Sequence, residues 1–412
     1  MRILVVSQYF WPEDFRINEL TQSLVEKGAR VDVLTGKPNY PEGVVRPGYR
    51  AWGTQREERQ GVSVFRVPLS PRGRGSALGL LFNYLSFIFS GLIFGPGLLR
   101  ARAYDAVFVY APSPLLQALP ALWLAHRKNV PCVLWVQDLW PESLSATGFI
   151  RNRYALALVG WVVRFIYRHV DRVLVPSEAF RAPIERLGVP SERINYYPNA
   201  YVEEHAFTPS SQDEVALARE IAAGFSVVFA GNLGTAQALE TVVEAAKLLQ
   251  EQGSPIRFFL IGSGSRAAWV QEEVVRCGLR NMRLPGRFPN QAMPIFYAAA
   301  GALLVSLRDE PIFAYTVPSK VQGYLAAGRP VIASLNGEGA RIISEAGAGL
   351  VCRAGDAEGL AQAVLQLQAN SAEERVAMGA AGRTYYLEYF ESGKLAKQLL
   401  RLLESIKKQE GS

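Results

Sequence analysis

The sequence predicts an α/β protein with two doubly wound domains, each a parallel sheet covered by helices on both faces. Two observations carry this prediction. Short apolar runs alternate with helical patterns along the whole chain, an order typical of parallel sheets. The length of 412 residues exceeds one ordinary domain, and it suits two domains of about 200 residues each.

Strand-like runs in the first half predict the first sheet. They begin with Arg2–Val6, which is apolar enough to be a buried strand, and stretches with helical periodicity separate them. We expect the first domain to cover residues 1–205. The runs are 2–6, 31–35, 62–67, 106–110, 132–137, 172–176 and 194–197.

A similar series follows a joint near residues 200–225 and predicts the second sheet. We expect this second domain to cover residues 206–390. Ligands of such sheets bind beyond the carboxyl ends of the strands, so the loops there should converge on a site. A last helix, at about 392–408, carries leucines at helical spacing. The strand-like runs are 226–230, 257–261, 302–306, 330–334 and 349–352.

Charge is concentrated in the first half. Residues 1–200 hold 24 Lys and Arg against 15 Asp and Glu, whereas residues 201–412 hold 20 against 22. A basic half indicates an anionic partner, for which lipid headgroups, a diphosphate and nucleic acid are candidates. Nucleic acid is disfavoured, because the sequence has no zinc-finger spacing, no RNP-like run and no dense Lys/Arg tract.

Cysteine usage and the first residues indicate a reducing compartment. Cys132, Cys277 and Cys352 are widely spaced, odd in number and without metal-ligand spacing. The three histidines are isolated from one another. No signal peptide precedes the first strand-like run, so we expect a cytoplasmic protein.

One uncharged segment departs from this soluble pattern. Residues 76–99 carry no charge and are long enough to span a bilayer. A span would place parts of the first sheet on opposite sides of the membrane, so we favour a helix lying at an anionic membrane surface, with Leu80, Phe87 and Ile93 on its apolar face. A buried helix pair and a true span stay open as alternatives. The basic residues that flank the segment are Arg72, Arg74, Arg100 and Arg102.

The segment 316–334, TVPSKVQGYLAAGRPVIAS, predicts a helix that starts at an anion site. Ser319 has the side chain of a helix cap and Gly328 marks the helix end, so we expect a helix over about 320–327. Lys320 would then lie beside free backbone N–H groups, which together attract a phosphate. An ordinary capped helix packed on a sheet is the alternative that the local pattern leaves open.

This segment resembles the donor-binding signature of retaining glycosyltransferases of the GT-B fold, family four (group 1). FAGNLGTAQAL (229–239), FFLIGSG (258–264) and the hinge-like YYPNA (196–200) follow in the order that the family uses. YFWPEDFRINELTQSL (9–24) is similar to the bacterial N-acetyl-fucosamine transferase branch of surface-polysaccharide assembly. The resemblance implies two Rossmann-like domains facing a cleft, with a final helix in 391–412 that crosses back to the first domain.

The resemblance also implies that the second domain binds a nucleotide-sugar donor, most commonly one that carries UDP. The family's donor loop has an arginine and a lysine where this chain has the neutral residues Asn232 and Gln237. A retaining transferase must stabilise the departing diphosphate with positive charge or oriented N–H groups. We therefore expect Lys320, with Arg266, to supply the missing charge, and we give Lys320 a catalytic role.

The family's ribose contact is altered as well. Its glutamate falls on Gly323 and the preceding acidic residue falls on Tyr315, so Gln322 or Glu338 would hold the ribose instead. The sequence has no aspartate-x-aspartate motif, and we expect no cofactor and no metal. The full donor-binding set that we expect is Gly231, Asn232, Gln237, Gly262, Gly264, Arg266, Arg287, Ser319, Lys320, Gln322 and Glu338.

The first domain should supply the acceptor chemistry at the ends of its strands. Asp138 follows a strand, where a carboxylate can accept a proton or fix a sugar hydroxyl, and capping the next helix is an equal alternative. Glu13 follows the first strand, and we expect a catalytic role for it, although it can also simply begin a helix with a suitable charge. The expected acceptor-binding residues are Arg16, Asn18, Trp140 and Glu142.

Three function classes remain open. We favour a sugar transferase at the inner face of the cell membrane, which moves an N-acetylated deoxysugar onto a polyprenyl-diphosphate-linked or other glycan acceptor. A nucleotide-sugar epimerase shares the two-domain fold but needs no lipid-facing segment. A noncatalytic partner protein would explain Gly323 and the absent arginine–lysine pair.

Overall fold

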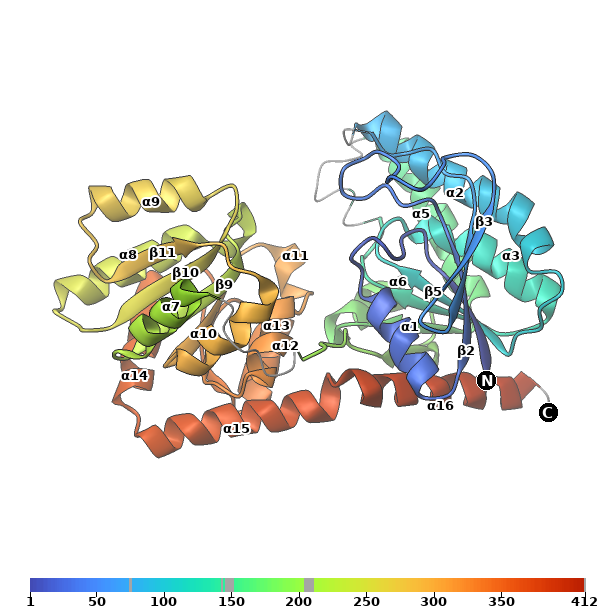
Figure 1. Ribbon diagram of the computed structural model, residues 1–412. Helices are drawn as coiled ribbons and strands as arrows, with labels where there is room; N and C mark the ends of the chain where they lie inside the picture. The colour runs from blue at the N-terminus through green and yellow to red at the C-terminus, as the bar shows by residue number, and fades with distance from the viewer. Residues whose placement is uncertain (74–75, 142–143, 145–151, 204–210, 411–412) are drawn as a thin grey trace. The chain divides into compact units, whose positions relative to one another are not determined.

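The computed structural model describes residues 1–73, 76–141, 144, 152–203 and 211–410 (Figure 1). The chain divides into two compact units. Unit 1 comprises residues 1–200 and 392–412, and unit 2 comprises residues 201–391. Each unit is built on its own, almost entirely parallel sheet, so the predicted fold class is confirmed.

Unit 1 contains an eight-stranded sheet in the order β3-β4-β2-β1-β5-β6-β7-β8. All neighbouring strands are parallel except β3, which runs antiparallel to β4. The strands are β1 (Arg2–Val6), β2 (Arg30–Thr35), β3 (Gln55–Arg59), β4 (Val62–Arg66), β5 (Ala106–Ala111), β6 (Cys132–Val136), β7 (Arg172–Val175) and β8 (Ile194–Tyr196).

The edge strand β3 is an addition to the strands that the sequence predicts. Its residues, QREER, include no apolar side chain, so no hydrophobic pattern marks it. The two-residue turn Gln60-Gly61 joins it to β4, and both turn residues have positive φ, at 48° and 80°, as a tight hairpin requires. Glu57 then pairs with the buried Arg66 of β4 at 2.5 Å. The turn and the ion pair, rather than hydrophobic burial, therefore position β3 at the edge of the sheet.

Helices cover both faces of the sheet in unit 1. On one face α1 (Ile17–Glu26) and α16 (Ser392–Glu410) contact each other, and Leu395, Leu399 and Leu403 of α16 join the core with Val31 and Val33. On the opposite face Leu34 of β2 meets α2 (Ala77–Leu98), because successive strand residues point to opposite sides. Next to α2 lie α3 (Ala118–Lys128) and then α5 (Arg153–His169), and α3 contacts both.

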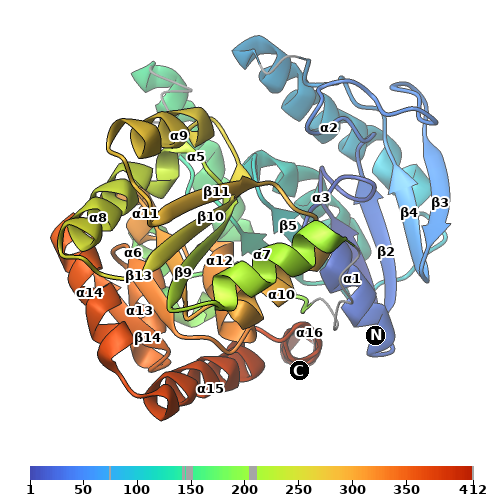
Figure 2. The same ribbon diagram turned by 60° about the vertical axis from the view of Figure 1, so that its left-hand side comes forward.

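Unit 2 contains six parallel strands in the order β11-β10-β9-β12-β13-β14. Figure 2 shows β9, β10 and β11 side by side. The edge strand β11 has the sequence MRLPG and lies outside the predicted set, because its two apolar residues give too short a pattern. The strands are β9 (Ser226–Asn232), β10 (Arg257–Ser263), β11 (Met282–Gly286), β12 (Ala302–Ser306), β13 (Val331–Ser334) and β14 (Gly349–Cys352).

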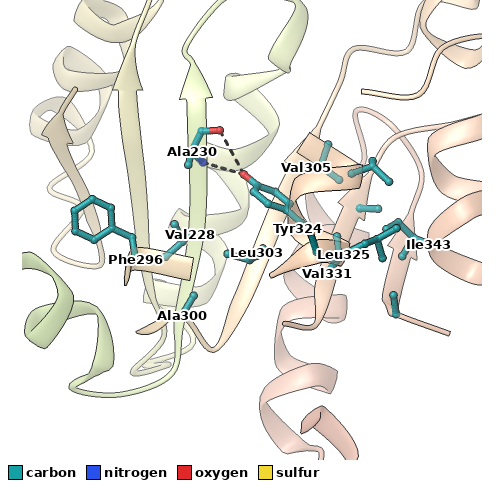
Figure 3. Close-up of a cluster of buried hydrophobic side chains, with 14 of the residues drawn as sticks. Val228, Ala230, Phe296, Ala300, Leu303, Val305, Tyr324, Leu325, Val331 and Ile343 are labelled. Atoms are coloured by element: carbon teal, nitrogen blue, oxygen red, sulfur yellow. Dashed lines mark hydrogen bonds between the residues drawn. The ribbon is translucent and has the colours of Figure 1, made fainter. Parts of the chain in front are cut away.

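Two hydrophobic cores cover the faces of the unit 2 sheet. In the first core Tyr324 is fully buried, and its hydroxyl accepts a hydrogen bond from the Ala230 backbone N–H at 3.0 Å (Figure 3). This hydrogen bond fixes the helix that carries Tyr324 against the end of β9. The first core includes α7 (Gln212–Ala222), α10 (Met293–Ala299), α12 (Ser319–Ala326), α13 (Glu338–Glu345) and α15 (Ala372–Tyr389), and the second includes α8 (Leu239–Glu251), α9 (Ala267–Arg276) and α14 (Ala357–Ala369).

The helix expected over 320–327 is α12, and it starts one residue earlier. Pro318 is its N-cap residue, and Ser319 is the first helical residue. The expected serine cap is therefore wrong, because Ser319 lies inside the helix and no described side chain caps this end. The Val321 N–H donates to the Pro318 carbonyl at 2.9 Å, whereas the N–H groups of Ser319 and Lys320 have no partner among the described residues.

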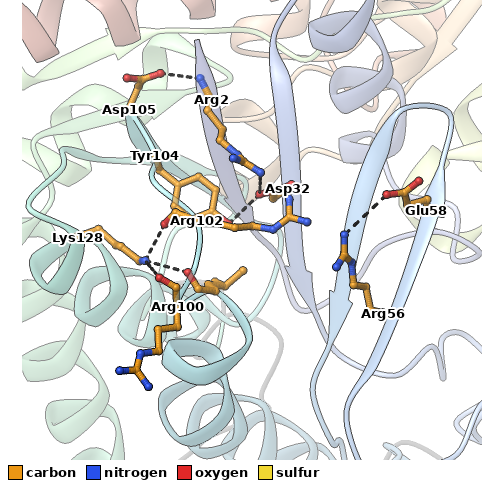
Figure 4. A network of polar contacts seen from close by, with 10 residues as sticks. Arg2, Asp32, Arg56, Glu58, Arg100, Arg102, Tyr104, Asp105 and Lys128 are labelled. Carbon is orange, nitrogen blue, oxygen red and sulfur yellow. Dashed lines mark hydrogen bonds and ion pairs between the residues drawn. The ribbon is translucent and has the colours of Figure 1, made fainter.

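A polar network closes the base of unit 1 (Figure 4). Asp32 accepts from Arg102 at 2.7 Å and from the Tyr104 hydroxyl at 2.9 Å, and it pairs with Arg2 at 3.3 Å. Arg102, one of the basic residues that flank the uncharged segment in sequence, therefore already has a buried carboxylate as its partner. Arg100 is exposed, whereas Arg74 lies outside the described residues.

Candidate functional site

The strand order of unit 2 reverses between β9 and β12. From β9 the chain adds β10 and β11 on one side, and the later strands follow on the other. In open parallel sheets, ligands bind beyond the carboxyl ends of the strands at such a reversal. Two hydrogen bonds join the loops there: Ser306 Oγ donates to the Gln237 carbonyl at 2.8 Å, and the Arg308 N–H donates to the Ala236 carbonyl at 3.0 Å.

Lys320 brings a positive charge to this point. Its Nζ donates to Gln237 Oε1 at 3.3 Å and lies 4.8 Å from the centre of the Phe229 ring. Burial disfavours the charged amine and lowers the pKa of Lys320 to about 8. Because a bound anion would favour the ammonium form, this amine is suited to meeting a diphosphate.

Two glycines make room for this arrangement. Gly231 has φ of +132°, and a Cβ there would come within 2.9 Å of Lys320 Cε. Gly262, beside it in the sheet register, has φ of +147°, and a Cβ there would come within 1.8 Å of the Gly231 carbonyl oxygen. Any side chain at either position would displace a strand end or the lysine.

A pocket of about 320 Å³ opens beyond the carboxyl ends of β9, β10 and β11. Of the expected donor set, Gly231, Asn232, Gly262 and Arg287 line it. Most of the other lining residues follow β11, the strand that the sequence did not reveal, so no signal directed attention to them. They are Ala230, Ile261, Ser263, Phe288, Asn290, Met293 and Tyr297.

Other residues of the expected donor set have partners of their own. Arg266 lies 3.9 Å from Glu240 and stacks 3.9 Å over the Trp269 ring, so its charge is already engaged. Glu338 is buried and pairs with Arg341 at 3.0 Å. Arg266 and Glu338 are less available to a ligand for the same reason, because each pairs with a neighbouring side chain of opposite charge.

The remaining members of that set are small, buried or exposed. Gly264 lies tightly against the backbone of Leu233, since a Cβ there would lie 2.5 Å from the Leu233 carbonyl group. Gln322 is buried, and Ser319 is exposed at the start of α12. The structure therefore brings Gly231, Gln237 and Lys320 together.

Gly323 occupies the position where the resembling family has a glutamate. A Cβ at Gly323 would lie 3.1 Å from the ring of Tyr201, in the same unit. A glutamate would need that ring to move, so the tyrosine explains why the smallest residue stands here.

In unit 1, Asp138 lies just beyond the carboxyl end of β6. Its side chain is exposed, yet the surrounding protein still removes enough water to raise its pKa to about 6. The negative charge of Asp138 acts on the hydroxyls of Tyr84 and Tyr110, which places both near it. Among the described residues, Gln137 Nε2 is buried without a hydrogen-bond partner, so a polar ligand could satisfy it.

The expected residues near β1 have structural partners. Glu13 is buried, and its carboxylate accepts from the backbone N–H groups of Asn39 at 2.7 Å and Tyr40 at 2.6 Å. Asn18 accepts from Trp11 N–H at 2.8 Å, and Arg16 donates to the Ala200 carbonyl at 2.8 Å. These contacts suit groups that fix a loop better than groups that bind or deprotonate a substrate.

Two further acceptor-side expectations have different outcomes. Trp140 is buried, so its ring packs inside the protein and is not free to stack on a sugar. Glu142 lies outside the described residues. Sequence reasoning also missed Tyr84, whose hydroxyl lies near both Asp138 and Arg72. Tyr84 lies in the uncharged segment 76–99, whose composition predicts membrane contact and gives no sign of an acceptor site.

Two family models match the chain. Residues 15–200 match a model described as "Glycosyl transferase 4-like domain", and residues 224–370 match "Glycosyl transferases group 1". Both models describe glycosyltransferases, so the protein is a glycosyltransferase. This glycosyltransferase is 29% identical over 343 residues to the putative colanic acid biosynthesis glycosyl transferase WcaI of Escherichia coli (strain K12), covering 80% of this chain and 82% of that protein.

Solved structures show the same fold. Sucrose-phosphate synthase from Thermosynechococcus elongatus superimposes with a TM-score of 0.72 at 18% identity, over 98% of each chain. Anabaena HepE in complex with UDP and glucose gives a TM-score of 0.66 at 16% identity, over 98% of this chain and all of that one. The glycosyltransferase therefore has the GT-B fold.

Proposed function

We propose that this glycosyltransferase moves a sugar from a UDP-linked donor, an N-acetylated deoxysugar, to a polyprenyl-diphosphate-linked or glycan acceptor, with retention of configuration. The product would belong to a bacterial surface polysaccharide, a proposal supported by the WcaI relative, which is named for colanic acid biosynthesis. The N-acetyl-fucosamine branch is the finer assignment, and it is supported by the similarity of residues 9–24.

The observation that carries this proposal is the Lys320 amine at the strand reversal of unit 2, beside the pocket that Gly231 and Gly262 line. In this reading the pocket takes the nucleotide, and Lys320 with the uncapped N-terminus of α12 stabilises the departing diphosphate. The complex of HepE with UDP supports a nucleotide of this kind. The positive charge makes a metal ion unnecessary, so EDTA should leave the rate unchanged.

On the acceptor side we assign Asp138 to the acceptor hydroxyl. Its raised pKa of about 6 suits a group that takes a proton near neutral pH, and the adjacent Gln137 amide would hold a sugar hydroxyl. Arg72, close to Tyr84, would face the acceptor diphosphate.

We place the protein in the cytoplasm, peripheral at the inner face of the cell membrane. α2 is long and apolar enough to cross a bilayer, but part of it is buried in unit 1. Its buried Asn83 accepts from Gln8 Nε2 at 2.6 Å and donates to the Ser70 carbonyl at 2.7 Å, which ties the helix to the sheet. A helix held in this way is suited to lying on a membrane.

The deciding experiment incubates the purified full chain with radiolabelled UDP-sugars and vesicles that contain a polyprenyl-diphosphate-linked sugar. Label in the organic phase, in a product whose anomeric configuration matches the donor, supports the proposal. A changed but still soluble nucleotide sugar would instead indicate an epimerase. Binding of UDP with neither product, across the sugar panel, would indicate a noncatalytic partner protein.

A further inference from the structure

An exposed aromatic stripe runs along α5. Tyr154, Leu158, Trp161 and Phe165 are 71%, 63%, 61% and 41% exposed, and their spacing places them on one face of the helix. The rings of Trp161 and Phe165 stack at 6.4 Å. The opposite face is buried through Val163, Ile166 and Tyr167, so α5 is held firmly while it presents large apolar side chains to its surroundings.

The described sequences of α2, α3 and α5 contain no aspartate and no glutamate. Asp171, which follows α5 and lines the adjoining cavity, accepts a hydrogen bond from the Cys132 N–H at 2.7 Å. Arg153, Arg164 and Arg168 of α5 are exposed beside its stripe. On the other face of the sheet, by contrast, α1 and α16 carry glutamates. The helices α2, α3 and α5 therefore carry only positive charges, whereas the helices α1 and α16 on the opposite face also carry negative ones.

The apolar surface continues from α5 to α2. Trp123 of α3 is 43% exposed, and it lines a cavity of about 660 Å³ that Phe165 of α5 also lines. On α2, Phe82, Phe89 and Ile93 are 61%, 58% and 68% exposed. α3 contacts both helices, so the three lie in a row on one face of unit 1 (Figure 1).

We propose that α5 is a docking helix for an anionic lipid bilayer, whose aromatic stripe enters the headgroup region while Arg153, Arg164 and Arg168 contact lipid phosphates. Aromatic residues with flanking arginines are the composition that membrane interfaces favour. This inference extends the membrane location in the proposed function from α2 to a second helix.

Charge decides between a bilayer and a second copy of the chain. A symmetric dimer through this face would bring arginines against arginines, and the three helices offer no carboxylate to pair with them. An anionic bilayer offers a phosphate for each. The net positive charge of residues 1–200 acts in the same direction.

The test measures flotation of the full chain with vesicles of phosphatidylcholine alone, or with about a third phosphatidylglycerol. We expect Leu158→Glu/Trp161→Glu to lower the partition coefficient at least tenfold while α2 is intact. Arg164→Gln/Arg168→Gln should reduce the preference for anionic vesicles. The matched control is Val275→Glu/Val376→Glu in unit 2, where the side chains are 73% and 66% exposed, and it should float as the wild type does.

A second measurement does not depend on the folding of a glutamate variant. Brominated lipids quench tryptophans that enter the bilayer, and Trp161→Phe should remove part of that quenching while binding persists. Unchanged quenching, or wild-type flotation of Leu158→Glu/Trp161→Glu, overturns the proposal. So does a lipid-free dimer that Leu158→Glu/Trp161→Glu dissociates in analytical ultracentrifugation, because the face would then bind a second copy. Neither measurement uses a sugar substrate, so transferase activity can stand or fall separately.

Discussion

At the scale of single residues, Lys320 brings a positive charge to a loop of neutral residues. The β9 loop has the neutral Asn232 and Gln237 in place of charged residues, and α12 brings an amine to the same loop from a distant part of the chain. One positive charge therefore lies at the strand reversal. The burial of that charge makes its protonation responsive to a ligand.

We predict that Lys320→Ala lowers turnover on the order of a hundredfold or more, because one preorganised partner of the departing diphosphate is lost. The fold should persist, which circular dichroism and the melting temperature check. The matched control is Lys247→Ala, an exposed lysine of α8 in the same unit. Wild-type kinetics for Lys320→Ala with its true donor would show that the charge acts elsewhere.

Binding of UDP should also depend on pH through Lys320. In the protein without UDP, the Lys320 amine has a pKa of about 8. A bound diphosphate raises this pKa, so the binding of UDP above pH 8 takes up a proton. Affinity should therefore fall as pH rises above about 8 and level off well below it. Calorimetry in buffers of different ionisation enthalpy measures the uptake, and Lys320→Met should abolish it. Equal proton uptake by both proteins would assign the titration to another group.

Asp138→Asn should lower the rate more than it weakens UDP binding, because the carboxylate acts on the acceptor. As the base must be ionised, the wild-type rate should fall as pH drops through about 6, the pKa that burial gives Asp138. The variant should lack that limb of the pH profile. A loss of UDP affinity equal to the loss of rate, or only a lower melting temperature, would point to helix capping instead.

At the scale of elements, α2 has two unlike apolar faces. Leu80 and Phe87 are 8% and 0% exposed and pack in unit 1, whereas Phe82 and Ile93 are 61% and 68% exposed. The expectation that Leu80 and Phe87 face lipid is therefore wrong, because those two positions are the inner face. Both faces of α2 carry large apolar residues, so only the packing in unit 1 distinguishes the inner face from the outer one.

Phe82→Glu/Ile93→Glu should move the protein from the membrane to the soluble fraction with its circular dichroism unchanged. Phe87→Glu, by contrast, should lower the melting temperature sharply, because it buries a charge without a partner. High salt should release the wild type only in part, since hydrophobic insertion is not screened. A wild type that is wholly soluble at low salt would contradict membrane docking by α2.

At the scale of the whole molecule, α16 belongs to unit 1, although it directly follows unit 2 in the sequence. It follows α15 of unit 2, yet Leu395, Leu399 and Leu403 are buried in the core of unit 1. The Tyr197 hydroxyl donates to the Leu395 carbonyl at 3.0 Å, which fixes the helix to the end of the first sheet. Unit 1 is therefore complete only when the last residues have joined it.

Leu399→Ala should destabilise unit 1 by about 2–5 kcal/mol, since it opens a cavity at a fully buried site. Tryptophan fluorescence during denaturant unfolding reports this unit, because six of the seven tryptophans lie in it. Leu402→Ala, one turn away and only partly buried, is the control and should cost less. Equal shifts for both variants would mean that α16 contributes little to the core.

The sequence by itself determined the parts of this protein that repeat a pattern. Parallel strands such as Arg2–Val6 read as unbroken apolar runs because both of their faces are buried, and the glycine loops after β9 and β10 mark the strand ends. The reaction class came from a resemblance in those same loops. Lys320 could be singled out because a helix start next to a lysine is a local feature.

Only the tertiary structure decided what each polar side chain meets. β3 has no hydrophobic pattern, and its place depends on a turn and on Arg66 of a neighbouring strand. Glu13 and Arg266 looked available in sequence, but the fold brings backbone N–H groups to one and Glu240 to the other. The physical reason is that burial patterns are written locally along the chain, whereas hydrogen bonds and ion pairs form between residues that only folding makes neighbours.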